Sequence, residues 1–329
     1  MSNIFSPSKA HFKVIGVGGA GCQMVSRIAG SQIPPPSFIE YIAMDTNTQD
    51  LALADVANRI QLGGRLLHGL DSGNDPAMGR RAAEESRGVI RQAIMDSHIV
   101  IILASLGGGT AAGAAPVIAE MAHRTGVLTI GMVTTPFAFE GARRMETAQQ
   151  GVTALMRSVD SLFVMPQDLT AAPCDGKADV GAVLQVPRDL MAKGIEMLNG
   201  AFYSAGMINL DFADLNSILK DSGLAEFSVG CASGEDRGAQ AAYAALANPA
   251  LGSKVKKAKA ALFTATGGSS LTLYEVNSAA DVIRNEVDPN SNILFAVHCD
   301  DTMGDEMKIA LIVTKFAGAE NSGLRGDGK

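Results

Sequence analysis

The feature that most constrains this chain is the alternation, in its first half, of short apolar runs with longer stretches of helical periodicity. This alternation is typical of strand–helix–strand units that form a mostly parallel sheet in an α/β fold. The expected strands are 12–17, 38–44, 99–103, 128–133 and 161–165, and the expected helices are 21–29, 80–95, 112–125 and 141–158. Because most of these strands end in loops rich in Gly, Pro, Asp or Thr, we expect a ligand site beside the carboxyl ends of the sheet.

The pattern changes in the second half of the chain, which at 329 residues is longer than one ordinary domain. A polar interruption at 171–179 precedes an expected helix at 182–203, which Pro187 should kink or shorten. The sequence then predicts helices at 211–222 and 237–248 and strands at 227–231, 260–266, 293–299 and 307–316. We therefore expect a Rossmann-like domain over 10–180, a connecting helix over 181–205, a smaller α+β domain over 206–317 and a disordered tail over 318–329.

The charge and cysteine content exclude several classes of protein. The chain has 27 Lys and Arg against 34 Asp and Glu, a net charge of −7, whereas nucleic acids and anionic membranes are normally met by a positive field. The longest aliphatic run, 99–104, is far shorter than the roughly 20 residues of a bilayer helix, and no signal-peptide pattern begins the chain, so we expect a cytoplasmic protein without membrane insertion. The four scattered cysteines predict neither disulfides nor a metal site.

The first strand leads directly into a glycine loop, Gly16–Gly21, which matches the pattern GxGxxG. Glycines at a strand-to-helix turn let the backbone approach a phosphate and present amide N–H groups and the positive end of a helix to it. Asp45 ends the second expected strand, where a dinucleotide enzyme keeps an acidic residue for the ribose. The first loop by itself therefore leaves a nicotinamide-dependent oxidoreductase open.

A second glycine loop, Gly107–Gly113, follows the strand at 99–103 and separates the alternatives. One diphosphate does not need two glycine cradles, whereas a nucleoside triphosphate can be held between both. The pattern GxxxxGK[ST] is missing, which excludes the P-loop class. Two further loops, 69–76 and 134–137 with Glu140 and Arg144 after it, should add polar groups on the same side of the sheet.

These residues resemble the FtsZ branch of the tubulin superfamily, GTP-dependent filament-forming proteins of bacterial division. Gly107–Gly113 is similar to the tubulin signature GGGTG[ST]G, and the segment from Pro136 to Met145, the sequence NLDFAD at 209–214 and the sequence SGEDR at 233–237 also match. The similarity runs in order from about Phe12 to Phe316 and implies the tubulin/FtsZ fold, with a Rossmann-like parallel-sheet GTPase domain, a central connecting helix and a smaller α+β domain.

The resemblance implies a role for each loop, with GTP or GDP as the ligand and Mg²⁺ accompanying it. It assigns the α- and β-phosphates to Gly18, Gly19 and Gly21 with Cys22 after them, and the β- and γ-phosphates to Gly107, Gly108, Gly109 and Thr110. Gly73 and Asn74 belong to the loop that senses the γ-phosphate. Glu140 would bind the ribose, Arg144 would reach the sugar and phosphates, and Asp189 would accept hydrogen bonds from guanine N1 and N2.

The loops of the first domain offer no obvious carboxylate pair to position a water at the γ-phosphate. The resemblance implies that a segment of the second domain supplies it. Asn209, Asp211 and Asp214 match the family segment that reaches the nucleotide of the neighbouring subunit, so that head-to-tail stacking completes the site and builds a filament. A helix N-cap with solvated acids is the alternative explanation of the same residues.

Several positions depart from the family pattern. The second glycine loop has Ala111 and Ala112 in place of a glycine and a hydroxyl residue, and the first is followed by Cys22 and Gln23 in place of asparagines. The loop after the second strand reads Asp45-Thr46-Asn47, which inverts the usual Asn-Thr-Asp, and an aromatic ring is replaced by Leu184. These changes predict GTP binding with reduced affinity or hydrolysis rate. The short segment after Phe316 lacks the adaptor-binding peptide of typical members, so we expect a tail-less paralogue. It would self-associate in a division or related organising role, or act as a co-polymer subunit with a full-length FtsZ.

Overall fold

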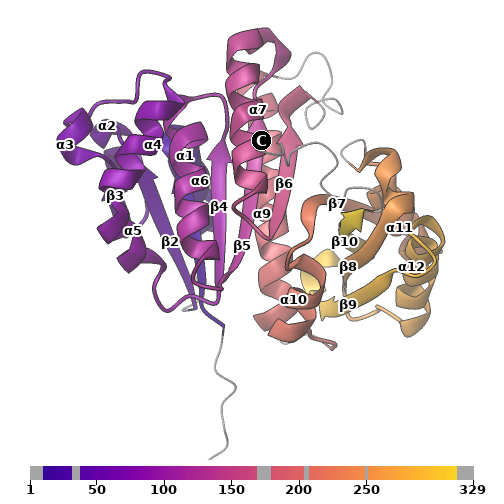
Figure 1. Ribbon diagram of the computed structural model, residues 1–329. Helices are drawn as coiled ribbons and strands as arrows, with labels where there is room; N and C mark the ends of the chain where they lie inside the picture. The colour runs from indigo at the N-terminus through magenta and orange to yellow at the C-terminus, as the bar shows by residue number, and fades with distance from the viewer. Residues whose placement is uncertain (1–9, 32–37, 169–178, 204–206, 249–250, 317–329) are drawn as a thin grey trace, which may run out of the picture. The chain divides into compact units, whose positions relative to one another are not determined.

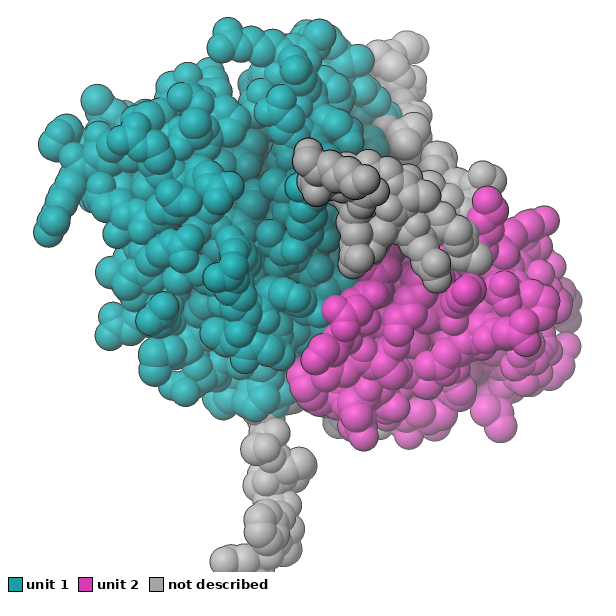
Figure 2. All heavy atoms as spheres, viewed as in Figure 1, with its two compact units in different colours: residues 1–168 teal, residues 169–329 magenta. Residues whose placement is uncertain are grey.

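The computed structural model describes residues 10–31, 38–168, 179–203, 207–248 and 251–316. The chain divides into two compact units, Met1–Asp168 and Leu169–Lys329, which Figure 2 shows in different colours. The expected tail and nearly all of the expected interruption at 171–179 lie outside the described residues. Each unit is described by itself below.

The first unit is built on a parallel sheet with the strand order β3-β2-β1-β4-β5-β6, which confirms the predicted Rossmann-like fold (Figure 1). The strands are β1 (Phe12–Val17), β2 (Ile39–Asp45), β3 (Asn58–Gln61), β4 (Ile99–Ser105), β5 (Leu128–Thr135) and β6 (Ser161–Pro166). The backbone register pairs Val17 with both Met44 and Ala104, so that these strands end at one level. Nearly every residue of β1, β4 and β5 is buried, as expected for strands covered on both faces.

Eight helical segments belong to the described part of the first unit: α1 (Gly18–Ser31), α2 (Thr48–Leu53), α3 (Gly64–Leu67), α4 (Pro76–Glu85), α5 (Arg87–Ile94), α6 (Gly109–His123), η1 (Ala138–Glu140) and α7 (Ala142–Met156). The single helix expected at 80–95 is wrong. Ser86 ends α4 and begins α5, because its φ and ψ of −91° and 12° leave the helical region. The hydroxyl of Ser86 accepts the N–H of Gly63 at 2.9 Å, a contact from outside the helix that the local pattern does not contain.

The second unit contains the expected connecting helix and four strands that neighbour one another (Figure 1). Helix α9 (Val180–Tyr203) includes Pro187 and is not shortened by it. The four strands are β7 (Gly223–Ser233), β8 (Ala258–Gly267), β9 (Asn292–Cys299) and β10 (Glu306–Phe316). They have the order β7-β10-β8-β9 and are antiparallel except for the pair β8–β9.

Helices α10 (Phe212–Leu219), α11 (Arg237–Leu246) and α12 (Leu273–Glu286) complete this unit, with the short η2 (Gly252–Lys257) and η3 (Asp301–Met303). Its core is formed by apolar side chains of α11, α12 and the strands, including Phe263, Ile283 and Leu311. Helix α12 has no counterpart among the expected elements. None of the described helices in either unit is long and apolar enough to cross a bilayer.

Candidate functional site

The two glycine loops are in place at the carboxyl ends of β1 and β4, where each leads into a helix. In the first loop, a Cβ at Gly16 would collide with the carbonyl oxygen of Gly21, and a Cβ at Gly21 would lie 2.8 Å from that of Leu103. These two glycines therefore allow α1 to pack closely on β1 and β4. Gly18 has a φ of 75°, which favours glycine, and Gly19 faces two carboxylates described below.

Cys22 is the fifth residue of α1 and has a buried thiol. Its Sγ lies 3.8 Å from the carbonyl oxygen of Gly16 and 3.7 Å from that of Met44. Burial, with the nearby Asp45 carboxylate, raises the pKa of this thiol to about 12. The side chain is therefore a neutral group turned towards backbone carbonyl groups.

The second glycine loop is clamped on two sides. A Cβ at Gly107 would lie 2.6 Å from Cγ of Pro136, and one at Gly109 would lie 2.6 Å from Oγ of Ser72. Gly108 differs, because no atom lies within 4 Å of the position of its missing Cβ. It is also the N-cap of α6, a 15-residue helix whose amino end carries unpaired N–H groups and a partial positive charge. The loop thus presents one open position at a helix amino end, the arrangement that binds phosphate groups.

A cluster of hydroxyl groups joins three loops beside this position. Oγ1 of Thr110 lies 3.0 Å from Oγ1 of Thr46, 3.1 Å from Oγ of Ser72 and 3.3 Å from Oδ1 of Asp71. Thr46 follows β2, Ser72 and Asp71 precede α4, and Thr110 begins α6. Thr46, Ser72 and Asp71 were not among the predicted site residues. The only available signal was their position in polar loops after strands or before a helix.

The predicted γ-phosphate loop forms the entry to α4. Asp75 caps this helix by accepting the N–H of Ala77 at 2.9 Å, and Pro76 follows at the first helical position. Gly73 and Asn74, with φ angles of 66° and 59°, form an exposed turn just before the cap. The tip of the loop is therefore open to solvent, while its base is held by the hydroxyl cluster.

Asp45 is a buried carboxylate at the end of β2. It is only 2% exposed, Oδ1 accepts the N–H of Thr46 at 2.7 Å, and Oδ2 is buried without a hydrogen-bond partner. A Cβ at Gly19 would lie 3.7 Å from Oδ2 of Asp45 and 2.9 Å from Oδ2 of Asp50. Burial, and to a smaller extent repulsion from Asp50 and Asp71, raises the pKa of Asp45 to about 6 even though backbone N–H groups oppose the shift.

The fourth loop brings Glu140 and Arg144 together. Oε2 of Glu140 lies 3.1 Å from a guanidinium nitrogen of Arg144, and Oε1 accepts the N–H of Phe137 at 2.9 Å. Phe139 is 81% exposed and stacks on Phe137 with the ring centroids 5.0 Å apart. The two residues assigned to the ribose and phosphates thus form an ion pair that a ligand can engage.

The remaining predicted site residues belong to the second unit. Asp189 lies on α9, and Asn209 precedes α10 on an exposed segment. Asp211 and Asp214 form a reciprocal cap of α10, in which Oδ1 of Asp211 accepts the N–H of Asp214 at 2.8 Å and Oδ2 of Asp214 accepts that of Asp211 at 3.0 Å. The helix-cap explanation of these acids is therefore confirmed, and it does not conflict with a second role, because a carboxylate accepts several hydrogen bonds.

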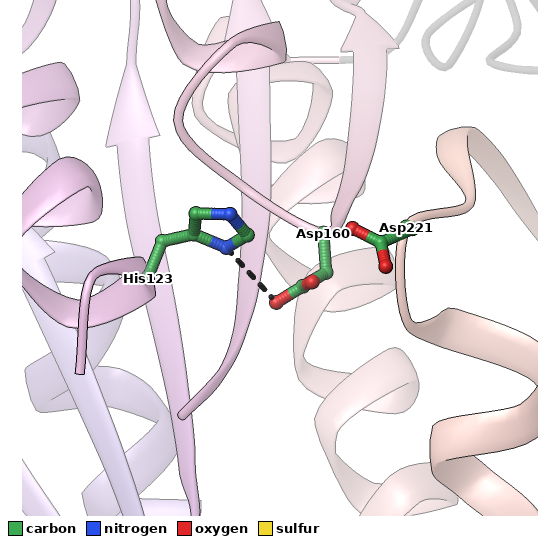
Figure 3. Close-up of side chains that lie close together, drawn as sticks. All are labelled: His123, Asp160 and Asp221. Carbon is green, nitrogen blue, oxygen red and sulfur yellow. Dashed lines mark ion pairs between the residues drawn. The ribbon is translucent and has the colours of Figure 1, made fainter. Parts of the chain in front are cut away.

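Figure 3 shows a second group of titratable side chains, of which His123 and Asp160 belong to the first unit. Nδ1 of His123 lies 3.4 Å from Oδ2 of the buried Asp160, which also accepts the N–H of Thr129 at 2.8 Å. His123 ends α6, whereas Gly108 caps its beginning, and 15 residues at 1.5 Å each place them about 22 Å apart. This ion pair therefore does not belong to the phosphate loops.

A parallel sheet of order 3-2-1-4-5-6 with glycine loops at its carboxyl edge defines a nucleotide-binding α/β protein. Residues 11–172 match the Tubulin/FtsZ family, GTPase domain, and residues 223–317 match the FtsZ family, C-terminal domain. The chain therefore belongs to the FtsZ branch of the tubulin/FtsZ family, which consists of cytoskeletal GTPases. Its membership excludes the nicotinamide-dependent oxidoreductase that the first loop left open.

Solved structures agree with this assignment. An empty FtsZ dimer from M. jannaschii is 31% identical, with 94% of this chain and 89% of that chain covered and a TM-score of 0.87. CetZ2 from Haloferax volcanii, solved as a GTPgS-bound protofilament, is 18% identical, with 95% of both chains covered and a TM-score of 0.81. CetZ1 from the same organism, solved as a GDP-bound monomer, is 18% identical, with 94% of this chain and 96% of that chain covered and a TM-score of 0.77. Both show a shared fold.

Proposed function

We propose that this protein binds GTP at the loops of its first unit, hydrolyses it and assembles head to tail into filaments. The observation that carries the proposal is the open position at Gly108, at the amino end of α6, inside a loop otherwise clamped by its neighbours. The loop is closely packed on both sides and has no side chain at its centre, so that backbone N–H groups can approach a phosphate. Gly18, Gly19 and Gly21 would serve the α- and β-phosphates in the same way.

Guanine and ribose recognition is assigned to Asp189, Glu140 and Arg144. An ionised carboxylate accepts hydrogen bonds only, which matches the two N–H groups of guanine and not the acceptor that adenine presents at N1. Glu140 can accept a bond from a ribose hydroxyl, and Arg144, already oriented by its ion pair with Glu140, can reach phosphate oxygens.

Hydrolysis would be completed by Asn209, Asp211 and Asp214 of a neighbouring subunit. These residues lie at the exposed amino end of α10, with Asp211 and Asp214 held in place by their reciprocal cap. Such prepositioned carboxylates can orient and polarise a water for in-line attack on the γ-phosphate, which is the main contribution a protein makes to phosphoryl transfer.

The loops of the first unit also fit the Mg²⁺ expected with the nucleotide. Mg²⁺ prefers oxygen ligands, and the hydroxyls of Thr46 and Thr110 lie together with the carboxylate of Asp71 between the loops. When bound, the ion would neutralise phosphate charge. Without it, the chain's own carboxylates would repel a triphosphate.

Repulsion between these carboxylates and the phosphates opposes nucleotide binding and hydrolysis. It therefore favours a second candidate function, a nucleotide-binding co-polymer subunit with weak GTPase activity that assembles with a full-length FtsZ. Three carboxylates, Asp45, Asp50 and Asp71, lie close enough to interact electrostatically beside the phosphate loops. In either case we propose a cytoplasmic protein that acts in cell division or a related organising process.

Phosphate release from GTP, measured over a range of protein concentrations with ATP as the control, tests the leading proposal. Specific activity should rise with concentration and should be absent with ATP. Sedimentation separates the two candidates, since the first predicts polymer that requires GTP and disassembles as GDP accumulates. Polymer that forms only after a full-length FtsZ is added, with little phosphate release from this chain, would favour the co-polymer subunit.

A further inference from the structure

Asp71 brings a carboxylate into direct contact with the start of α6. Its Oδ1 atom lies 3.3 Å from Oγ1 of Thr110, the second residue of α6, and 3.3 Å from Oγ of Ser72. The same atom accepts the N–H of Ser72 at 2.6 Å, which holds the carboxylate in this position. Asp71 is exposed, whereas Ser72 and Thr110 are buried. A negative charge therefore lies at the exposed end of the hydroxyl cluster.

The amino end of α6 is also the place where the two glycine loops meet. The first hydrogen bond of the helix runs from the N–H of Ala112 to the carbonyl oxygen of Gly108 at 3.1 Å, so the three preceding N–H groups have no acceptor within the helix. A Cβ at Gly18, in the first glycine loop, would lie 3.3 Å from the backbone nitrogen of Ala111. A phosphate bound to these N–H groups therefore lies next to the hydroxyl group of Thr110.

The hydroxyl protons of this cluster are directed towards Asp71. Each hydroxyl carries one proton, and an ionised carboxylate only accepts hydrogen bonds. Oγ of Ser72 donates to Oδ1 of Asp71, and Oγ1 of Thr110 donates to the same carboxylate oxygen or to Ser72. A phosphate oxygen likewise accepts hydrogen bonds and donates none. The carboxylate and a phosphate beside Thr110 therefore compete for one proton.

This competition affects a triphosphate more than a diphosphate. The proposed function assigns the β- and γ-phosphates to the second glycine loop. A diphosphate has one phosphate fewer at this loop and can leave the hydrogen bond between Thr110 and Asp71 intact. A triphosphate takes the proton away from Asp71 and places a second negative charge beside the carboxylate.

Asp50 is a neighbouring carboxylate that lacks this contact. Its Oδ2 atom accepts the side-chain amide of Asn47 at 3.2 Å and would lie 2.9 Å from a Cβ at Gly19. Gly19 belongs to the loop assigned to the α- and β-phosphates, which GDP and GTP share. Asp50 therefore opposes both nucleotides alike, whereas Asp71 opposes the triphosphate.

We propose that Asp71 is a specificity-determining residue, which competes with the terminal phosphate for the hydroxyl proton of Thr110 and so favours GDP over GTP. The inference rests on the proposed GTP binding and deepens it, because it assigns the balance between the two nucleotides to one side chain. The site then binds GDP more tightly, relative to GTP, than the glycine loops alone would.

Binding of GDP and of the non-hydrolysable analogue GMPPCP to the full chain tests this assignment by calorimetry, in excess EDTA so that no cation compensates the charge. Asp71→Asn keeps an acceptor for the N–H of Ser72 and removes the charge. It should raise the affinity for GMPPCP relative to GDP at least about tenfold, with GDP affinity within about threefold of the unmutated protein. Asp50→Asn, the matched control, should leave the relative affinity within about threefold.

A second background separates competition for the proton from charge repulsion alone. Thr110→Val keeps the shape of the side chain and removes the hydroxyl group, so that Asp71→Asn should then raise the relative affinity less than about threefold. Thermal unfolding shows that each variant is folded. A relative affinity in Asp71→Asn that is unchanged or lower, or an equal effect with and without the Thr110 hydroxyl, would overturn the inference and leave GTP binding intact. If neither GDP nor GMPPCP binds the unmutated protein, the proposed function and the inference fail together.

Discussion

Gly108 and Gly113 are five residues apart, yet a side chain at each would meet different surroundings. Around Gly108 the space is open, and its φ of −93° and ψ of 158° suit any residue. At Gly113 a Cβ would collide with the carbonyl oxygen of Pro76, at the start of α4. The first glycine therefore leaves room for the proposed phosphate, and the second allows α6 to pack on α4.

A pair of substitutions separates these two roles. Gly108→Val should fold, with a melting temperature within a few degrees of the unmutated protein, and should lose measurable GTP binding because the side chain occupies the phosphate position. Gly113→Ala should lower the free energy of unfolding by about 1–3 kcal/mol through overpacking. Thermal unfolding and binding of a fluorescent GTP analogue check both. GTP binding that survives in a folded Gly108→Val protein would contradict the assignment.

Asp189 carries the proposed preference for guanine. Asp189→Ala should weaken GTP binding by about ten- to a hundredfold, the usual value of charge-assisted hydrogen bonds, and should reduce the discrimination against ATP. Glu196→Ala, on an exposed position of the same helix, is the control for loss of one negative charge. Competition binding with GTP and ATP measures both effects. Equal binding of the two nucleotides by the unmutated protein would remove the assignment.

At the scale of elements, α10 shows how one pair of acids can have two roles. The reciprocal cap of Asp211 and Asp214 stabilises the first turn of the helix, and the same carboxylates are the proposed catalytic groups. Asparagine caps a helix about as well as aspartate, whereas alanine does not. The cap and the charge can therefore be removed one at a time.

Asp211→Asn should retain the stability of the unmutated protein and lose GTP hydrolysis. Asp211→Ala should lose hydrolysis and about 1 kcal/mol of unfolding free energy. Urea unfolding and phosphate release at saturating GTP measure the two properties, with GTP binding expected to be nearly unchanged in both variants. Unmutated rates of hydrolysis in Asp211→Asn would leave these acids with a structural role alone.

Strand β9 carries a buried titratable group, His298, which faces α9. The Nε2 atom of His298 would lie 3.7 Å from a Cβ at Gly200, beside a cavity of about 310 Å³. Other titratable side chains lining this cavity are Lys193, Glu196, Cys299, Asp300 and Lys308. Burial, with a smaller contribution from Lys308, lowers the pKa of His298 below its usual value of 6.5.

This shift predicts a dependence of stability on pH. The unfolded chain binds a proton at His298 near pH 6.5, whereas the folded chain does so only at lower pH. The stabilising contribution is therefore complete above the unfolded pKa and decreases as the pH falls from about 6.5 towards the folded pKa. His298→Gln should show a smaller loss of unfolding free energy between pH 7.5 and pH 5 than the unmutated protein. Urea titrations at both pH values measure it, and parallel losses would contradict the prediction.

At the scale of the whole molecule, the proposed phosphate loops and the proposed catalytic acids belong to different units of the chain. If neighbouring subunits share each site, two inactive variants should complement each other. Gly108→Val retains its acids and Asp211→Asn retains its phosphate loops. A mixture of the two should therefore regain part of the GTPase activity that neither has alone.

The mixing experiment needs proof that both variants are folded and enter the same polymer, which circular dichroism and co-sedimentation provide. Recovered activity should be greatest near equal amounts of the two proteins, because mixed interfaces are then most frequent. Activity that stays at the level of the separate variants at every ratio would contradict a site shared between subunits.

Local patterns in the sequence were sufficient for most elements of the fold. Strands β1, β4 and β5 could be predicted because a short continuous run of apolar residues is typical of a buried strand. Helix α12 was missed although Thr272 and Glu275 form a capping box at its start. The break at Ser86 was not predicted, and the N–H that its hydroxyl accepts comes from Gly63, which is distant in the sequence.

By itself the sequence determined the parallel α/β architecture, the two glycine loops and the family, since these depend on periodicity and on residue types at fixed local spacing. Only the tertiary structure decided that Thr46, Ser72 and Thr110 meet in one cluster. It also decided that Gly108, alone among Gly107, Gly108 and Gly109, faces open space, and that Oδ2 of Asp45 has no hydrogen-bond partner. The physical reason is that strand order and register bring loops together across many residues, and hydrogen bonding and burial at their meeting point belong to no single segment.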